Sequence, residues 1–280
     1  MKLVAAAALL AVPLLSACPK PRTSAATQPS PAAFDLGKSD PKAVAVVDAG
    51  MTALGGYDKW DGLKELRFGV HNVVNGEVVS EFEHAWDRWN GRHYFAVTDP
   101  ATLKGKPEDM KTTEVKHDLF DKDASPWAAY DGSPIMRSDA KAQAVLATKQ
   151  LTADLYYLAL IYKIKDPGAI LAVDNVEMRI PDEVPACKPS CTSIKLTFEK
   201  GVGTDTWYVD YNNETRLPDV IELQRGAGRV GYLLSDWVEA GGLKWPGKVS
   251  NIGAKGAEDR EFLDVRVGEP DASRYEVQVR

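Results

Sequence analysis

A run of alternating apolar and polar residues constrains the fold of this 280-residue chain more than any other feature. Phe82, His84 and Trp86 alternate with acidic residues, and this period of two puts neighbouring side chains on opposite faces of a β-strand. The dipeptides Asn75-Gly76 and Asn90-Gly91 are typical of tight hairpin turns. The segment is therefore predicted to be an antiparallel meander of three strands that these turns separate.

The lengths of the two hairpin loops decide which residues of this meander share a face. A three-residue loop with a bulge at Asn75-Gly76 pairs even-numbered residues with each other, whereas a two-residue loop buries carboxylates at a high cost. A two-residue loop at Asn90-Gly91 pairs Trp86 with Phe95. The acids Glu81, Glu83 and Asp87 then lie on the opposite, solvated face. The apolar face is predicted to line a ligand cavity, and its residues are Phe68, Val70, Phe82, His84, Trp86, Phe95 and Val97.

Helical segments precede and follow the meander. Asp40 is a good helix cap and Pro41 suits a first turn, so a helix with an apolar face is predicted to run from there to Gly55-Gly56. A second helical region is predicted from Asp139 to Ile164, carrying a long apolar stripe. Whether these helices fill the predicted cavity is left open by the sequence.

The second half of the chain is rich in β-strand patterns. The order helix, meander, helix, second meander predicts an α+β fold, with one long curved antiparallel sheet and helices on its concave face. The strands expected after the second helix are Val176–Ile180, Thr192–Phe198, Thr206–Tyr211, Asp219–Arg225, Arg229–Trp237, Leu243–Ile252 and Arg260–Val267.

The N-terminus has the pattern of a secretory signal. Lys2 precedes an apolar core that is too short to span a bilayer, and small residues follow it. The run Leu15-Ser16-Ala17-Cys18 resembles a bacterial lipobox, which predicts cleavage before Cys18 and acylation of that cysteine, with palmitate among the acyl groups. An ordinary signal peptide and a buried apolar helix are the alternatives. We expect residues 1–17 to be the signal, 18–39 a lipidated tether and 40–280 one domain.

Cys187 and Cys191 remain once Cys18 is acylated, and they form an even pair in one short segment. An exported protein meets an oxidising compartment, so a disulfide between them is expected, with free thiols as the alternative. A metal site needs more ligands, and the sequence places no histidine nearby. No metal and no cofactor is therefore expected.

The composition argues against nucleic-acid binding and gives no support for catalysis. The chain has 34 basic and 40 acidic residues, a formal charge of −6, which becomes −7 once Lys2 leaves with the signal. An acidic surface without a basic block repels phosphate backbones. Serine-hydrolase, zinc-protease and P-loop motifs are missing, so no catalytic residue is expected and the four histidines are interpreted as structural. A buried group of convergent polar residues would revive the enzyme hypothesis.

Four stretches resemble bacterial proteins related to the outer-membrane lipoprotein-sorting proteins, the LolA/LolB-like group. They are ALGGYDKWDGLKELRF (Ala53–Phe68), YYLALIYKIKDPG (Tyr156–Gly168), TWYVDY (Thr206–Tyr211) with LPDVIEL (Leu217–Leu223), and the segment Leu234–Lys248. The resemblance implies an unclosed antiparallel β-barrel covering a few helices, with a hydrophobic cavity that takes acyl chains. This chain departs from the sorting carriers in its lipid anchor and long insertions, so no functional residue is transferred.

These observations predict a lipid-anchored periplasmic lipoprotein that binds a lipid or another lipophilic molecule. Pro19 follows Cys18, so the aspartate that would retain a lipoprotein in the inner membrane is absent, and the outer membrane is favoured. The alternative is an envelope protein that does not carry lipid and instead docks a protein partner on its sheet or loops. The alternative predicts a core filled by helices and an exposed apolar patch.

Overall fold

The computed structural model describes residues 34–280 except residues 122, 176–179, 181–183, 254–255 and 277–280. The expected signal, Cys18 and residues 18–33 of the expected tether therefore lie outside the described residues. The described residues belong to one compact unit. Among the described residues, no helix has both the length and the apolar character needed to cross a membrane.

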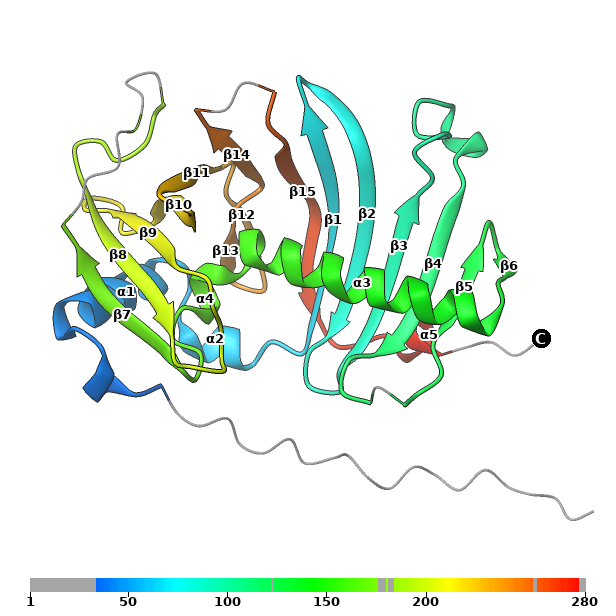
Figure 1. Ribbon diagram of the computed structural model, residues 1–280, viewed down its shortest axis with the longest axis horizontal. Helices are drawn as coiled ribbons and strands as arrows, with labels where there is room; N and C mark the ends of the chain where they lie inside the picture. Colours follow the sequence, from blue (N-terminus) through cyan, green and yellow to red (C-terminus); the bar gives the residue numbers. More distant parts are fainter. Residues whose placement is uncertain (1–33, 122, 176–179, 181–183, 254–255, 277–280) are drawn as a thin grey trace, which may run out of the picture. The chain divides into compact units, whose positions relative to one another are not determined.

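One antiparallel sheet of 13 strands forms the frame of the domain (Figure 1). Its strand order is β6-β5-β4-β3-β2-β1-β15-β14-β11-β10-β9-β8-β7, and β12 pairs with β13 in a separate sheet. The two edge strands, β6 and β7, do not pair with each other, so the sheet is not closed. The strands are β1 (Glu65–Val74), β2 (Glu77–Asp87), β3 (Arg92–Thr98), β4 (Thr112–Asp118), β5 (Trp127–Tyr130), β6 (Ser133–Pro134), β7 (Ala169–Asp174), β8 (Cys191–Phe198), β9 (Trp207–Asn212), β10 (Pro218–Arg225), β11 (Gly228–Ser235), β12 (Val238–Ala240), β13 (Leu243–Trp245), β14 (Lys248–Ile252) and β15 (Asp259–Gly268).

Helices α1, α3 and α4 pack on one face of this sheet, which we call the inner face (Figure 1). Their buried side chains share one hydrophobic core with β1 and β7–β11, and a smaller cluster lies where α3 crosses β3–β5. A large antiparallel sheet with few helices confirms the expected α+β class. The helices are η1 (Leu36–Lys38), α1 (Pro41–Ala53), α2 (Tyr57–Asp61), η2 (Pro107–Asp109), α3 (Arg137–Leu158), α4 (Leu160–Lys163) and α5 (Ala272–Tyr275).

Helix α1 starts as the sequence predicts. The Asp40 side chain accepts a hydrogen bond from the Lys42 backbone N–H at 2.8 Å, and Pro41 occupies the first turn. Gly50 lies in the middle of the helix, where glycine is unfavourable. A Cβ atom at this position would come within 2.3 Å of the Tyr211 ring, so glycine allows α1 to pack closely on β9.

The β1–β2 hairpin has the predicted parity but a different turn. Val74 pairs with Glu77, so Asn75-Gly76 is a two-residue turn, and both residues have positive φ, as a type I′ turn requires. The register shifts between Asn72 and Val73, which places the extra residue inside strand β2 rather than in the turn. Even-numbered residues therefore face each other as expected.

The β2–β3 register differs from the predicted one by two residues. Asp87 pairs with Arg92, so four residues form the loop, and Trp86 lies opposite His93 instead of Phe95. Asp87 explains the wider loop, because its carboxylate accepts hydrogen bonds from Asn90 Nδ2 at 2.9 Å and Arg92 Nε at 2.7 Å. This acid was expected in solvent, but it has no exposed surface. A shift of two preserves parity and adds His93 to the inner face.

The second meander also departs from prediction in places. Strand β7 was not predicted, and the expected strand Val176–Ile180 lies largely outside the described residues. The expected strand Leu243–Ile252 is two strands, β13 and β14, separated by Pro246-Gly247. Proline cannot donate to a sheet ladder, and the Gly247 N–H bonds Asp236 O at 3.1 Å instead.

Residues 34–39, assigned to the tether from the sequence, contact the domain. Lys38 forms an ion pair with Glu199 at 2.9 Å, and the Lys165 ammonium lies over the Phe34 ring. The Leu171 N–H donates to Ser39 Oγ at 3.0 Å, and the Asp40 N–H donates to Leu171 O at 2.8 Å. The chain entering α1 therefore satisfies backbone groups on the outer edge of β7.

Candidate functional site

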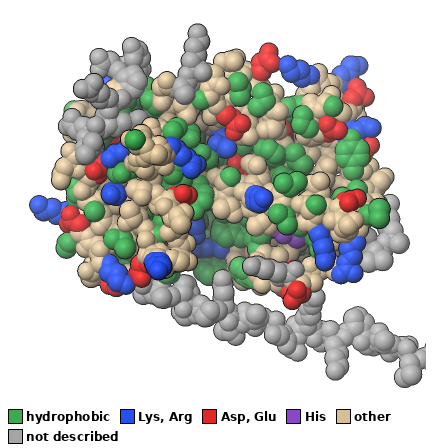
Figure 2. Space-filling model, viewed as in Figure 1, with side chains coloured by type: hydrophobic (Ala, Val, Ile, Leu, Met, Phe, Trp, Pro, Cys, Tyr) green, Lys and Arg blue, Asp and Glu red, His purple; other side chains and the backbone are tan. Residues whose placement is uncertain are grey.

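Helix α3 covers a band of the inner face of β1–β5 and leaves sheet on either side of it. An α-helix with its side chains is about 10–12 Å wide, whereas strands as long as β1 and β2 extend for roughly 33 Å. Figure 1 shows α3 running across these strands rather than along them. Figure 2 shows that the surface is hollowed below the helix, where hydrophobic side chains and a histidine are visible. This hollow is the candidate site.

The predicted cavity-lining residues fall into three rows across the sheet, each made of cross-strand neighbours on the inner face. The middle row lies under α3, since Ala140 and Ala147 of the helix pack in the cluster that contains Phe95 and Val115. The rows are Val70–Phe82–Val97, Phe68–His84–Phe95–Val115 and Leu66–Trp86–His93–His117. The pairing confirms that the seven predicted residues share one face, and their role in lining a ligand cavity stays a prediction.

The large aromatic side chains of the two flanking rows are less buried than those of the middle row. Phe68, His84 and Phe95 are buried. Phe82 and Trp86, in the rows on either side, are half-buried although they pack against the core. Trp86 Nε1 is buried and has no hydrogen-bond partner among the described residues. Beside α3, the inner face therefore offers the apolar surface of Phe82 and Trp86.

A chain of hydrogen-bonded polar side chains crosses the inner face from α3 to β4. Asp154 Oδ2 of α3 lies 3.1 Å from His84 Nε2, and His84 Nδ1 lies 3.1 Å from His93 Nε2. His93 Nδ1 lies 2.8 Å from His117 Nε2. Asp154, His84 and His93 have no exposed surface, whereas His117 is half-buried. We call these four residues the histidine chain.

The surroundings of the histidine chain keep two of its imidazoles neutral. Burial, together with the neighbouring His84 and His117, places the pKa of His93 well below 6.5. Burial lowers the pKa of His117 to about 4, although Asp118 acts in the opposite direction. At the other end, Asp154 also accepts from Gln150 Nε2 at 2.9 Å, and Arg260 Nε lies 3.3 Å from its second oxygen.

The sequence analysis placed His84 on the inner face, but it did not predict the other three residues of the histidine chain. It placed His93 near a turn, because the wider β2–β3 loop was not foreseen. The sequence did contain a signal for Asp154, because this charged residue lies between Leu151 and Leu158 in the stripe of α3 that faces the sheet. A charged residue at a buried helical position requires a partner.

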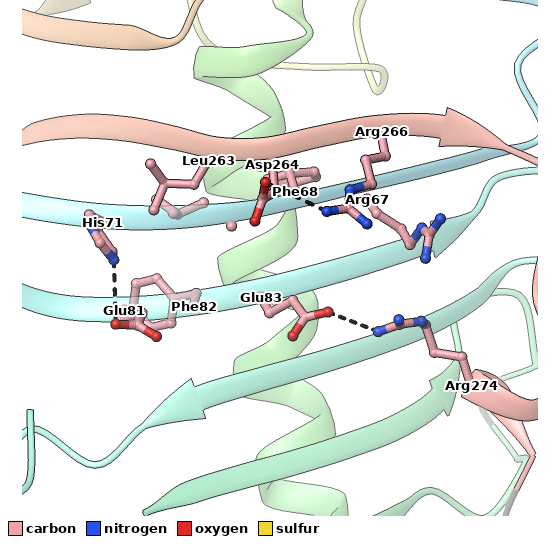
Figure 3. Close-up of a pocket in the computed structure, with 12 residues that line it drawn as sticks. Arg67, Phe68, His71, Glu81, Phe82, Glu83, Leu263, Asp264, Arg266 and Arg274 are labelled. Carbon is pink, nitrogen blue, oxygen red and sulfur yellow. Dashed lines mark hydrogen bonds and ion pairs between the residues drawn. The ribbon is translucent and has the colours of Figure 1, made fainter. Parts of the chain in front are cut away.

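The outer face of the same sheet holds a polar pocket of about 290 Å³. Figure 3 shows α3 behind the strands and the pocket in front of them. Arg67 and Arg266 are direct cross-strand partners, and Arg274 of α5 joins them. Each arginine has an acidic partner, so this pocket presents no uncompensated charge to a ligand. The pairs are Arg67 with Glu65 at 3.0 Å, Arg266 with Asp264 at 3.6 Å and Arg274 with Glu83 at 2.8 Å.

A second buried polar group lies on the outer face of β9 and β10. Glu222 has no exposed surface, and burial and the neighbouring Asp210 raise the pKa of Glu222 to about 8. Burial also raises the pKa of Asp210. Arg229 partly offsets both acids and reaches Asp174 at 2.8 Å. This cluster contributes to pH-dependent stability and lies on the face opposite to the hollow.

Cys187 and Cys191 form the expected disulfide. Together with Asp219 they are the one group of three or more potential metal ligands that converge in the described part of the chain. Both sulfur atoms are used in the disulfide, and the Asp219 carboxylate accepts from the Cys187 N–H at 2.7 Å and Asn212 Nδ2 at 2.9 Å. The arrangement ties the loop before β8 to β9 and β10.

No protein-family model and no curated protein matches the chain. Among solved structures, it is similar to a DUF1329 family protein from Desulfovibrio piger, with 15% identity over 85% of this chain and 98% of that one, at a TM-score of 0.43. It is also similar to a LolA superfamily protein from Nitrosomonas europaea, with 11% identity over 81% and 97%, at a TM-score of 0.40. A likeness to MucB has 13% identity over 85% and 63%, at a TM-score of 0.27. At such identities the likeness concerns the fold alone.

Proposed function

We propose that this protein binds a lipophilic molecule in the hollow beside α3, and that it acts by binding rather than by catalysis. The carrying observation is that α3 covers the middle row of the inner face and leaves Phe82 and Trp86, in the flanking rows, half-buried. Each methylene of a ligand that leaves water on such a surface contributes about 0.8 kcal/mol. An acyl chain laid along the helix therefore gains enough to bind.

The direct test is native mass spectrometry of the purified domain, followed by solvent extraction and identification of the bound molecules. We expect an amphiphile to copurify, or to load after delipidation. Repeated failure to find or load any amphiphile contradicts the proposal.

Two matched variants locate the ligand. Trp86→Leu keeps an apolar side chain on the inner face, so the domain should fold and bind a bulky ligand more weakly. Trp89→Leu is the control, because Trp89 lies in the β2–β3 loop and is 49% exposed. Equal affinity of both variants for the loaded amphiphile would place the ligand elsewhere.

We further propose that Cys18 anchors the protein to a membrane through acyl chains, with the domain on the periplasmic side of the outer membrane. The support is the lipobox pattern and the absence of aspartate after Cys18. Cys18→Ala should release the protein from the membrane fraction, and continued sedimentation with membranes would contradict anchoring at this residue.

Docking of another protein is the second candidate. Val145 and Leu146 are each 55% exposed on α3, and Met136 just before the helix is 72% exposed. Exposed apolar side chains grouped on one element favour a protein contact. A photo-crosslinking residue at position 146 should then form one discrete adduct in intact cells, and the same residue at position 141 of α3 is the control.

A further inference from the structure

When its imidazoles are neutral, the hydrogen bonds of the histidine chain all run in one donor-to-acceptor direction. Both oxygens of Asp154 accept hydrogen bonds, one from Gln150 Nε2 and the other from Arg260 Nε, and a carboxylate has acceptors alone. His84 must then donate through Nε2, which leaves its Nδ1 as an acceptor. His93 donates to that atom through Nε2, and His117 donates to His93 in the same way. Each step leaves a lone pair on the next Nδ1.

The histidine chain therefore ends in a hydrogen-bond acceptor, Nδ1 of His117. No described residue forms a hydrogen bond with this nitrogen. His117 is half-buried and belongs to the row Leu66–Trp86–His93–His117, which flanks the part of the sheet that α3 covers. The same row holds Trp86 Nε1, a buried donor without a partner in the described chain. Of these two atoms, Trp86 Nε1 is buried, so His117 Nδ1 is the one that a ligand on the apolar surface can reach.

Charged groups contact the histidine chain at both of its ends. Asp154 of α3 is offset by Arg260 of β15, whose guanidinium also pairs with Glu258 at 3.2 Å and lies over the Tyr157 ring. On the β4 side, Asp118 is the acid that acts on His117. Since burial holds the pKa of His117 near 4, its Nδ1 remains an unprotonated acceptor at neutral pH.

Resting on the function proposed above, we propose that His117 Nδ1 recognises the head group of the bound lipid, and that this head group is an uncharged one bearing a hydroxyl. A hydroxyl donates to His117, so it suits a surface whose accessible polar atom is an acceptor. An ionised carboxylate has no hydrogen to donate to His117, and an ester without a hydroxyl also leaves this acceptor unpaired. The ligand class is a monoacylglycerol or a long-chain alcohol.

The first test is the tautomer of His117 in the purified protein at pH 7. Nitrogen-15 NMR distinguishes a ring nitrogen that carries hydrogen from one that does not. We expect hydrogen on Nε2 and none on Nδ1 for His84, His93 and His117. A proton added to His84 would reverse all the hydrogen bonds between the histidines, so hydrogen on His117 Nδ1 would overturn the inference without any binding measurement.

The second test compares ligands with the same acyl chain. Monopalmitoylglycerol should bind about tenfold more tightly than methyl palmitate, because the hydrogen bond to His117 Nδ1 is lost in the ester. His117→Phe should bind both ligands equally. His71→Phe is the control, because His71 lies in the outer-face pocket, and it should keep the preference.

The outcomes separate this inference from the proposed function. If neither ligand, nor palmitate itself, binds the wild-type protein, the lipid-binding function fails and this inference fails with it. If the wild-type protein binds both palmitoyl esters equally, or binds palmitate best, lipid binding stands and the hydroxyl preference is wrong. Persistence of the preference in a folded His117→Phe variant assigns it to another residue and likewise overturns the inference.

Discussion

His84 Nε2 lies 3.1 Å from Asp154 Oδ2, and this contact attaches helix α3 to the sheet at a place where neither side chain touches solvent. Arg260 of β15 reaches the same carboxylate from the other side at 3.3 Å. Asp154 therefore holds α3 to two strands through polar contacts, in a region where apolar side chains pack elsewhere. The position of α3, and with it the hollow below the helix, depends on this carboxylate.

Removal of the Asp154 carboxylate should destabilise the domain strongly. Asp154→Leu leaves Arg260 and His84 without their partner in a buried site, and breaking such a pair from one side typically costs about 3–5 kcal/mol. Asp154→Asn retains an acceptor and should cost less. Asp139→Asn, at an exposed position of the same helix, should change the free energy of unfolding by less than about 0.5 kcal/mol. Urea denaturation measures all three, and a loss below about 1 kcal/mol for Asp154→Leu would contradict the assigned role.

Stability should fall as the pH is lowered from about 6.5 to about 4. The pKa of His117 is near 4 in the folded domain and 6.5 in the unfolded chain, so the unfolded state binds more protons in this interval. The stabilising effect is complete above pH 6.5 and is lost as the pH falls toward 4, by at most roughly 3 kcal/mol for this group. His117→Gln should flatten this part of the profile of unfolding free energy against pH. An unchanged profile would show that His117 is not buried as described.

The contribution of Glu222 to stability should fall as the pH rises, whereas that of His117 falls as the pH is lowered. The folded pKa of Glu222, about 8, lies above the ordinary 4.5, so its contribution is complete below pH 4.5 and is lost as the pH rises to 8. Glu222→Gln removes the ionisation and the repulsion with Asp210. We expect the stability of the variant minus that of the wild type, measured by thermal unfolding, to be larger at pH 9 than at pH 5. A difference that does not change with pH would contradict this prediction.

The disulfide should give a moderate stabilisation. Cys187 and Cys191 are four residues apart, and closing so short a loop restricts the unfolded chain by about 2 kcal/mol. The double variant Cys187→Ser, Cys191→Ser should lose that amount in urea denaturation and match the reduced wild type. A loss near zero would show that the hydrogen bonds of Asp219 hold this loop without the covalent link.

Features encoded by neighbouring residues could be predicted from the sequence, and features that join distant residues could not. Asp40 and Pro41 define the start of α1 by themselves, and β8 (Cys191–Phe198) lies within one residue of the predicted strand Thr192–Phe198. The β2–β3 register is an exception among the local features, because Asp87 organises a wider loop through side-chain bonds that no turn signal records. The histidine chain was missed because it joins distant elements, since Asp154 lies 70 residues from His84 in the sequence.

The strand order has a consequence for when the domain can form. The centre of the sheet is β15, which pairs with β1 on one side and β14 on the other, and it follows all the other strands of the sheet in the sequence. Without Asp259–Gly268, the two meanders would remain separate sheets with open edges at β1 and β14. Pairing of β15 with β1, which are far apart in the sequence, has a high entropic cost of loop closure and is slow. The two halves of the sheet therefore cannot join until residues 259–268 have been synthesised, and a truncation before β15 exposes two unpaired strand edges rather than removing one peripheral element.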